Sequence, residues 1–173
     1  TTFTQQIGQL VNLSNLVDNW LFFQAIGGFD NSNKNVYYAA RNENGNYRGY
    51  FIPWDLNISF GAVYADNKYY AEETLEETET QVQFEPGCRA IALDADGARA
   101  LAKEKWEDWK EKAFTAEALL ERAQHLQQEL TGSGAMAREM ERWPGGNAST
   151  DLSLLTEFTK QRMAYMDSMI DGL

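Results

Sequence analysis

The sequence predicts a mainly helical α+β domain that carries one small antiparallel β-hairpin. Its 173 residues suit a single domain and are enough to bury a core. Apolar residues recur at helical spacing over the first 26 residues and over most of the chain after residue 94. Between them, two β-rich stretches flank Asn44-Gly45, which is a strong hairpin signal. These observations favour one hairpin set on a helical body.

The N-terminal part predicts one long helix followed by the hairpin. Apolar side chains keep helical spacing from about residue 5 to 26, and Gly27-Gly28 marks the expected end of that helix. The stretches "NVYYAA" and "YRGYFI" are rich in β-branched and aromatic residues and flank the turn "RNENGN". Pro53 should end the second strand, because proline has no N–H to donate to a ladder.

The segment from about Ala65 to Glu85 is acidic and polar, with the run "EETLEETETQ" and no clear period. Charge runs of this kind are typical of solvated segments. We therefore expect residues 66–85 to form an exposed, mobile insertion, to which the sequence assigns no function.

The remainder predicts helices. The stretch "DADGARALAKEKWEDWKEKA" has near-helical apolar spacing, and a second helix opens at Thr115, a plausible N-cap. A short "AMAREMERW" segment then ends at the Pro-Gly-Gly of residues 144–146. We expect Thr150 or Asp151 to cap a last helix that runs to about Asp171. The apolar stripe of that helix consists of Leu154, Leu155, Phe158, Met163, Tyr165, Met166 and Ile170.

Composition limits the possible partners. The chain has 26 acidic and 15 basic residues, a formal charge of −11. That charge repels phosphate backbones and anionic lipids, so it argues against nucleic-acid and membrane-surface roles. No run of about 18 apolar residues predicts a membrane-spanning helix. The single Cys88 rules out an internal disulfide and leaves the redox compartment open.

The chemistry-bearing residues lie at the two ends of the predicted hairpin. Asp30 and Asn35 stand in a polar loop before it, and Asp55 follows it directly. The order D-x-x-x-x-N, hairpin, Asp is the one in which protein kinases hold their catalytic loop and metal-binding aspartate. Because a hairpin folds back on itself, its two ends lie side by side. We therefore expect these three side chains to meet at one point.

Turn chemistry is the alternative explanation for the same residues. Asp and Asn are common in loops, and Asp55 could simply cap the turn that follows it. Lys34, inside the loop, is the best basic candidate for contacting a γ-phosphate or a substrate, and the sequence alone favours a lysine that faces solvent over that role.

Other conspicuous residues have structural explanations. His125 has no cysteine or second histidine near it, so we expect a solvated or capping histidine rather than a zinc ligand. Cys88 has no histidine at useful spacing and is expected to be a structural thiol. Trp106 and Trp109 lie three residues apart on one predicted helix, which favours packing over a sugar platform. We expect Trp54 to pack into the core.

The stretch "VDNWLFFQAIGGFDNSNKNVYYA" followed by "YFIPWDLNISFG" resembles the spore coat protein H (CotH) kinase family. In that family a helix leads into an Asp/Asn loop, then a hairpin, then an I-P-W-D signature. The segments "ERWPGG" and "EFTKQRMAYMDSMI" are similar to the family's closing helix, with its recurring arginine and Y-x-D pattern. The resemblance covers most of the chain, and its specific motifs lie within residues 17–61.

The resemblance implies a kinase-like fold that uses ATP and Mg²⁺ or Mn²⁺ to phosphorylate protein serine or threonine. It makes Asp30 the catalytic-loop aspartate, acting as base or metal ligand, and Asn35 its metal-ligating amide. Asp55 would bridge metal and phosphates. Asn57 stands where the family usually has a second acid, in W-D-x-D, and an amide there could still ligate without carrying a charge. A spore-surface, extracellular or cell-surface location is suggested by the family alone.

Kinase-like sites also need an N-terminal lobe, with a phosphate-binding lysine and a sheet that covers adenine. The roughly thirty residues before Asp30 are too few to form one, and the chain starts at Thr1-Thr2 without an initiator methionine or signal peptide. We therefore expect residues 1–173 to be the C-terminal lobe of a CotH-like kinase, inactive without the missing lobe. The alternative is a non-catalytic surface or scaffold module that keeps the fold.

Overall fold

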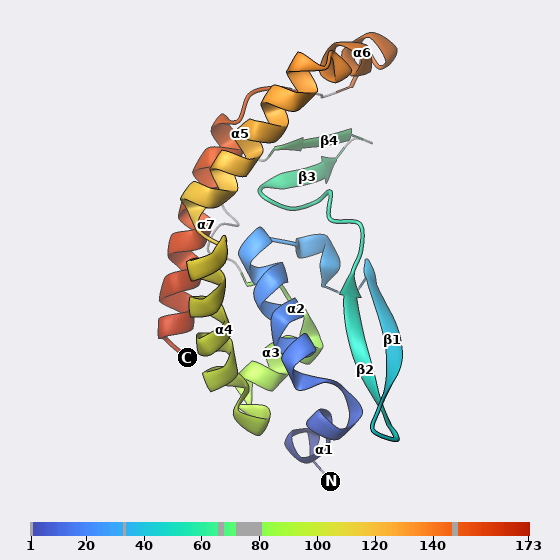
Figure 1. Ribbon diagram of the computed structural model, residues 1–173, viewed down its shortest axis with the longest axis vertical. Helices are drawn as coiled ribbons and strands as arrows, with labels where there is room; N and C mark the ends of the chain where they lie inside the picture. The colour runs from blue at the N-terminus through green and yellow to red at the C-terminus, as the bar shows by residue number, and fades with distance from the viewer. Residues whose placement is uncertain (1, 33, 66–67, 72–80, 147–148) are drawn as a thin grey trace.

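A computed structural model describes residues 2–32, 34–65, 68–71, 81–146 and 149–173 (Figure 1). Its elements confirm the mainly helical α+β class. In chain order they are α1 (Phe3–Leu10), α2 (Leu13–Ile26), η1 (Phe29–Asn31), β1 (Val36–Glu43), β2 (Asn46–Pro53), β3 (Ala62–Ala65), β4 (Lys68–Ala71), α3 (Glu85–Ala92), η2 (Ala95–Gly97), α4 (Ala98–Lys112), α5 (Ala116–Gly132), α6 (Ala135–Arg142) and α7 (Ser153–Asp171).

Helix α2 runs through the centre of the molecule, and α3, α4, α7 and β2 pack around it (Figure 1). Its side chains Leu16, Leu21 and Phe23 are completely shielded from solvent. This burial agrees with the apolar residues on all sides of the helix. Trp106 of α4 and Met166 of α7 belong to the same core. The helix that leads into the polar loop is therefore a central part of the hydrophobic core.

The predicted single helix over residues 5–26 is wrong, because the chain breaks at Val11 and Asn12. The Asn12 side chain accepts a hydrogen bond from the Asn15 backbone N–H at 2.9 Å and so caps α2. The Asn12 N–H donates to the Gly49 carbonyl of β2 at 3.0 Å, and Val11 pairs with the same residue. Pairing with the hairpin, which helical periodicity cannot reveal, interrupts the helix.

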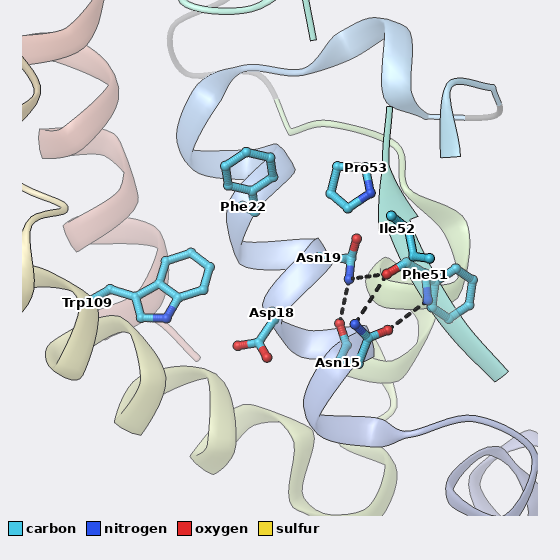
Figure 2. Close-up of a pocket in the computed structure, with 8 residues that line it drawn as sticks. All are labelled: Asn15, Asp18, Asn19, Phe22, Phe51, Ile52, Pro53 and Trp109. Atoms are coloured by element: carbon cyan, nitrogen blue, oxygen red, sulfur yellow. Dashed lines mark hydrogen bonds between the residues drawn. The ribbon is translucent and has the colours of Figure 1, made fainter. Parts of the chain in front are cut away.

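The hairpin β1–β2 is confirmed, with a register that pairs Val36 with Pro53 and Glu43 with Asn46. Asn44 and Gly45 have φ of 54° and 93°, as a two-residue type I′ turn requires. Asn15 of α2 accepts from the Phe51 N–H at 2.7 Å and donates to the Phe51 carbonyl at 3.2 Å (Figure 2). These two hydrogen bonds of the Asn15 side-chain amide hold the hairpin against α2.

The expectation of an exposed insertion over residues 66–85 is wrong near its C-terminal end, where the chain is buried, and its start is paired as a strand. Strands β3 and β4 pair antiparallel at its start, and Val82 and Phe84 are buried in the core. The Gln24 side chain holds the Val82 backbone, donating to its carbonyl at 2.7 Å and accepting from its N–H at 2.8 Å. The acidic run at residues 72–80 lies outside the described residues.

The C-terminal helices follow the prediction closely. Thr115 caps α5 by accepting from the Ala118 N–H at 3.2 Å. Of the two candidate caps for α7, Asp151 is the one whose side chain accepts from the helix, at 2.9 Å from the Ser153 N–H. Trp106 is buried and Trp109 is half-buried, and both rings pack against Phe114, which confirms the packing interpretation. No described helix is long and apolar enough to cross a membrane.

Candidate active site

The polar loop begins where α2 ends. Gly27 takes a left-handed conformation, with φ of 62°, and closes the helix with hydrogen bonds to the Gln24 and Phe23 carbonyls. A single turn of 3₁₀ helix, η1, follows and contains Asp30. The chain then enters β1, so the loop lies at the open end of the hairpin, away from the Asn44-Gly45 turn (Figure 1).

Asp30, Lys34 and Asn35 are in direct contact. The Asn35 amide nitrogen Nδ2 donates to Asp30 Oδ2 at 2.6 Å, and Lys34 Nζ lies 2.8 Å from Asp30 Oδ1. The structure thus brings the two ends of the predicted D-x-x-x-x-N pattern together. The Lys34 side chain is 69% exposed and that of Asp30 21%, so the ion pair is well solvated and adds little stability.

Asp55 reaches the same end of the hairpin from the other strand. The Trp54 N–H donates to the Asn35 carbonyl at 2.9 Å, and Asp55 follows immediately. Asp55 is exposed, with φ of 53°. Within the described residues no hydrogen bond or ion pair holds its carboxylate, so the alternative that it caps the next turn has no cap bond to support it. Asn57, two residues further on, is also exposed.

Asn31 is a residue of the site that sequence reasoning missed. Its side chain is fully buried, and its Nδ2 donates to the Asn35 carbonyl at 2.9 Å and to the Trp54 carbonyl at 2.9 Å. It therefore ties the loop to both strand ends. No sequence signal separates it from the neighbouring asparagines, because its partners lie four and 23 positions away.

The backbone around this point is unusual. Three non-glycine residues here have positive φ: Asn35 at 57°, Asp55 at 53° and Phe60 at 52°. Each such conformation costs about 1–2 kcal/mol for an L-residue, somewhat less for Asn and Asp. The Phe60 N–H donates to the Ile26 carbonyl at 2.7 Å, which fastens the turn after Asp55 to the end of α2. Strained backbone of this kind is concentrated at functional sites.

The oxygen atoms at this point suit a magnesium or manganese ion. Asp30 and Asp55 offer carboxylates, and Asn35 uses its amide nitrogen on Asp30, which leaves its amide oxygen Oδ1 for another partner. Hard oxygen ligands are those that these ions prefer. Within the described residues no three Asp, Glu, His or Cys side chains form a ligand cluster. An ion at this point would have at most the two carboxylates of Asp30 and Asp55 as charged ligands, with amide and water oxygens as the others.

Trp54 does not pack into the core as expected. It is 57% exposed and meets Tyr37 edge to face at 5.2 Å between ring centroids. The reason is strand alternation: Phe51 points inward, so Ile52 and Trp54 point outward. The Trp54–Tyr37 pair therefore forms an exposed aromatic surface beside Asp55.

The two remaining candidates behave as expected. His125 is exposed and lies 3.7 Å from Glu129 on its own helix. Burial raises the pKa of the Cys88 thiol, and its Sγ lies 3.3 Å from the Val82 carbonyl. A raised pKa keeps the thiol protonated and weakly nucleophilic, which agrees with a structural cysteine.

A mostly apolar cavity of about 330 Å³ lies between the hairpin and the helices (Figure 2). Phe51, Ile52 and Pro53 line it from β2, and Phe22 and Trp109 from α2 and α4. Its one carboxylate, Asp18, pairs with Lys105 at 2.8 Å. The cavity therefore offers mostly apolar surface, and its one carboxylate is already paired with a lysine.

The site brings an aspartate, an asparagine and a lysine into contact at the open end of a hairpin that is set on a helical body. A model of the family described as CotH kinase protein matches residues 1–166, so the chain belongs to the CotH kinase family. No curated protein and no solved structure gives a significant match.

Proposed function

We propose that this domain is the catalytic-loop lobe of a protein kinase that transfers the γ-phosphoryl group of ATP to a serine or threonine of a protein. The observation that carries the proposal is the contact between Asp30 and Asn35 at the open end of a hairpin whose second strand leads into Asp55. Membership of the CotH kinase family supports it.

Each polar side chain has a role in this proposal. Asp30 accepts or orients the proton of the attacking hydroxyl, or ligates the metal, and the Asn35 amide fixes its carboxylate for either task. Asp55 and the Asn35 oxygen would hold Mg²⁺ or Mn²⁺, with Asn57 as an uncharged further ligand. Lys34 contacts the γ-phosphate. The bound ion would neutralise the charge that develops on the transferred phosphoryl group.

A nucleotide-covering lobe is part of the proposal. Kinase-like sites place a sheet over the adenine and a lysine on the α- and β-phosphates. In the described part of this chain the strands form two-stranded sheets only. We propose that a second lobe completes the site in the full-length protein and that residues 1–173 alone do not phosphorylate.

The test is phosphate incorporation from radiolabelled ATP with Mg²⁺ or Mn²⁺, measured on the full-length protein as autophosphorylation and on Ser/Thr peptides. Asp30→Asn and Asp55→Asn should each abolish incorporation. Asp96→Asn is the matched control, because Asp96 is also exposed with φ of 50° but lies in η2, in contact with α1. Incorporation that survives in Asp55→Asn would refute the proposed role.

The second candidate is a non-catalytic surface or scaffold module. It is favoured by the ion pair between Lys34 and Asp30, which already neutralises one candidate ligand, and by the uncharged Asn57. Titration calorimetry of the full-length protein with Mn²⁺ and with an ATP analogue separates the two. Absence of binding heat for both ligands supports the scaffold, and saturable binding of both supports the kinase.

A further inference from the structure

Asn31 lies buried between the two strand ends that carry the candidate ligands. We propose that it is a positioning residue, whose amide sets the relative placement of the Asp30–Asn35 pair and Asp55. The inference rests on the proposed function, because that function gives the placement a purpose. It concerns Asn31 as a support and does not make it a ligand.

The hydrogen bonds of Asn31 fix how its amide is oriented. Both atoms within reach of Nδ2 are backbone carbonyl oxygens, of Asn35 and of Trp54, each at 2.9 Å. Carbonyl oxygens only accept, so the nitrogen of the amide must face them. The Trp54 N–H also donates to the Asn35 carbonyl at 2.9 Å. The loop and both strand ends are thereby joined through one side chain.

These two bonds act on the peptide units next to the candidate ligands. The Trp54 carbonyl belongs to the unit that leads into Asp55, and the Asn35 carbonyl to the unit that leaves Asn35. Asp55 and Asn35 have left-handed backbones, with φ of 53° and 57°. A residue other than glycine keeps a left-handed backbone conformation only where the surrounding structure holds it there. Asn31 supplies one such constraint on each side of the site.

The oxygen of the Asn31 amide indicates that an asparagine stands here because of the two hydrogen bonds that its nitrogen donates. Asn31 Oδ1 is buried and has no hydrogen-bond partner among the described residues. Leaving a buried acceptor unpaired is costly, so a site selected for stability alone would favour a residue without one. The asparagine at residue 31 is explained by the two carbonyls it binds.

Asn19 provides a matched control. It is 4% exposed where Asn31 is 0% exposed, and its Nδ2 also donates to two backbone carbonyls, of Asn15 at 2.8 Å and of Phe51 at 3.1 Å. Its Oδ1 is likewise buried without a partner. Asn19, however, binds the Phe51 carbonyl within β2 (Figure 2), whereas Asn31 binds the Trp54 carbonyl, directly before Asp55.

The experiment compares Asn31→Asp with Asn19→Asp in the 173-residue chain. Each change replaces two donors by an acceptor of the same shape, so both variants should melt below the wild type. We expect only Asn31→Asp to weaken Mn²⁺ binding, measured by calorimetry, by at least tenfold relative to wild type. In amide NMR spectra only this variant should shift the resonances of Asn35 and Asp55. Equal loss of Mn²⁺ affinity in both variants, or unchanged affinity in Asn31→Asp, overturns the proposal.

Two further outcomes are decided by NMR. If Asn31→Asp does not fold, the wild type is titrated with Mg²⁺ instead. The NMR signals of the Asn31 side-chain NH₂ group should then shift, while those of Asn19 stay in place. Asn31 signals that do not move contradict the proposal. If the wild type binds neither ion, the metal part of the proposed function fails. The positioning role is then judged by whether Asn31→Asp, and not Asn19→Asp, moves the Asn35 and Asp55 resonances.

Discussion

Replacing Asp55 by asparagine should separate a functional carboxylate from a structural one. The side chain is exposed and has no described hydrogen bond, and asparagine accepts the left-handed backbone that φ of 53° requires. Exposed substitutions without such contacts stay within about 0.5 kcal/mol. A domain of this size shifts its Tm by roughly 2–4 °C per kcal/mol. The Tm of the metal-free variant should therefore stay within about 2 °C of wild type.

The response to metal should differ much more. An ion that binds only the folded state at 100 times its Kd adds about 2.7 kcal/mol. With the same conversion, Mn²⁺ should raise the Tm of the wild type by roughly 5–10 °C. Asp55→Asn should lose this rise, because the amide is uncharged and only one carboxylate of the pair, Asp30, remains.

Thermal melts with and without Mn²⁺ measure both quantities, and Asp96→Asn is the control. Asp96 has the same exposed, left-handed setting, with φ of 50°, but lies beside α1. It should keep the full metal-induced shift. A variant Asp55→Asn that is destabilised by more than about 1 kcal/mol, yet responds to Mn²⁺ like the wild type, would refute the reasoning and make Asp55 a structural residue.

Two predictions concern stability elsewhere. Arg162→Met should lower the free energy of unfolding, measured in urea, by about 2–4 kcal/mol, because the buried guanidinium donates to the Gln24 carbonyl at 2.6 Å. The control Arg142→Met, at an exposed arginine, should lower it by less than about 0.5 kcal/mol. Equal losses in the two variants would contradict this prediction. Hydrogen bonds, first from Tyr50, hold the pKa of Glu43 below its usual 4.5. The stabilisation from Glu43 is thus present above pH 4.5 and is lost as the pH falls through the lower folded-state pKa. Between pH 7 and pH 3.5, the free energy of unfolding measured in urea should therefore fall less for Glu43→Gln than for the wild type. An identical fall in both proteins would contradict this prediction.

The features that the sequence predicted correctly depend on local chemistry. Asn44-Gly45 specifies its own turn, since both residues favour positive φ. Thr115 caps the helix that begins next to it. The Asp30–Asn35 contact could also be anticipated, because the five-residue spacing spans a single loop. In each case the interacting groups are near neighbours along the chain.

The features that the sequence did not predict depend on distant partners. The break at Asn12 follows from pairing with Gly49, and the burial of Val82 depends on the side chain of Gln24. The acidic run that precedes Val82 in the sequence concealed its return to the core. Asn31 was missed for the same reason, because one of its two carbonyl partners comes from the far strand of the hairpin. Local pattern does not contain this information.

The segment that carries the candidate site is closed at both ends by one side chain from α7. Gly27 and Gly61 both have positive φ, 62° and 80°, and both lie against the ring of Phe158. A Cβ on Gly27 would come within 2.6 Å of that ring and one on Gly61 within 3.1 Å, so glycine alone allows this approach. Arg162, one turn further along α7, binds the Gln24 carbonyl just before Gly27. The C-terminal helix therefore holds the loop that contains Asp30, Asn35 and Asp55, although none of its own residues belongs to the site. Since α7 is more than ninety residues away in the sequence, the geometry of the site depends on the completed fold.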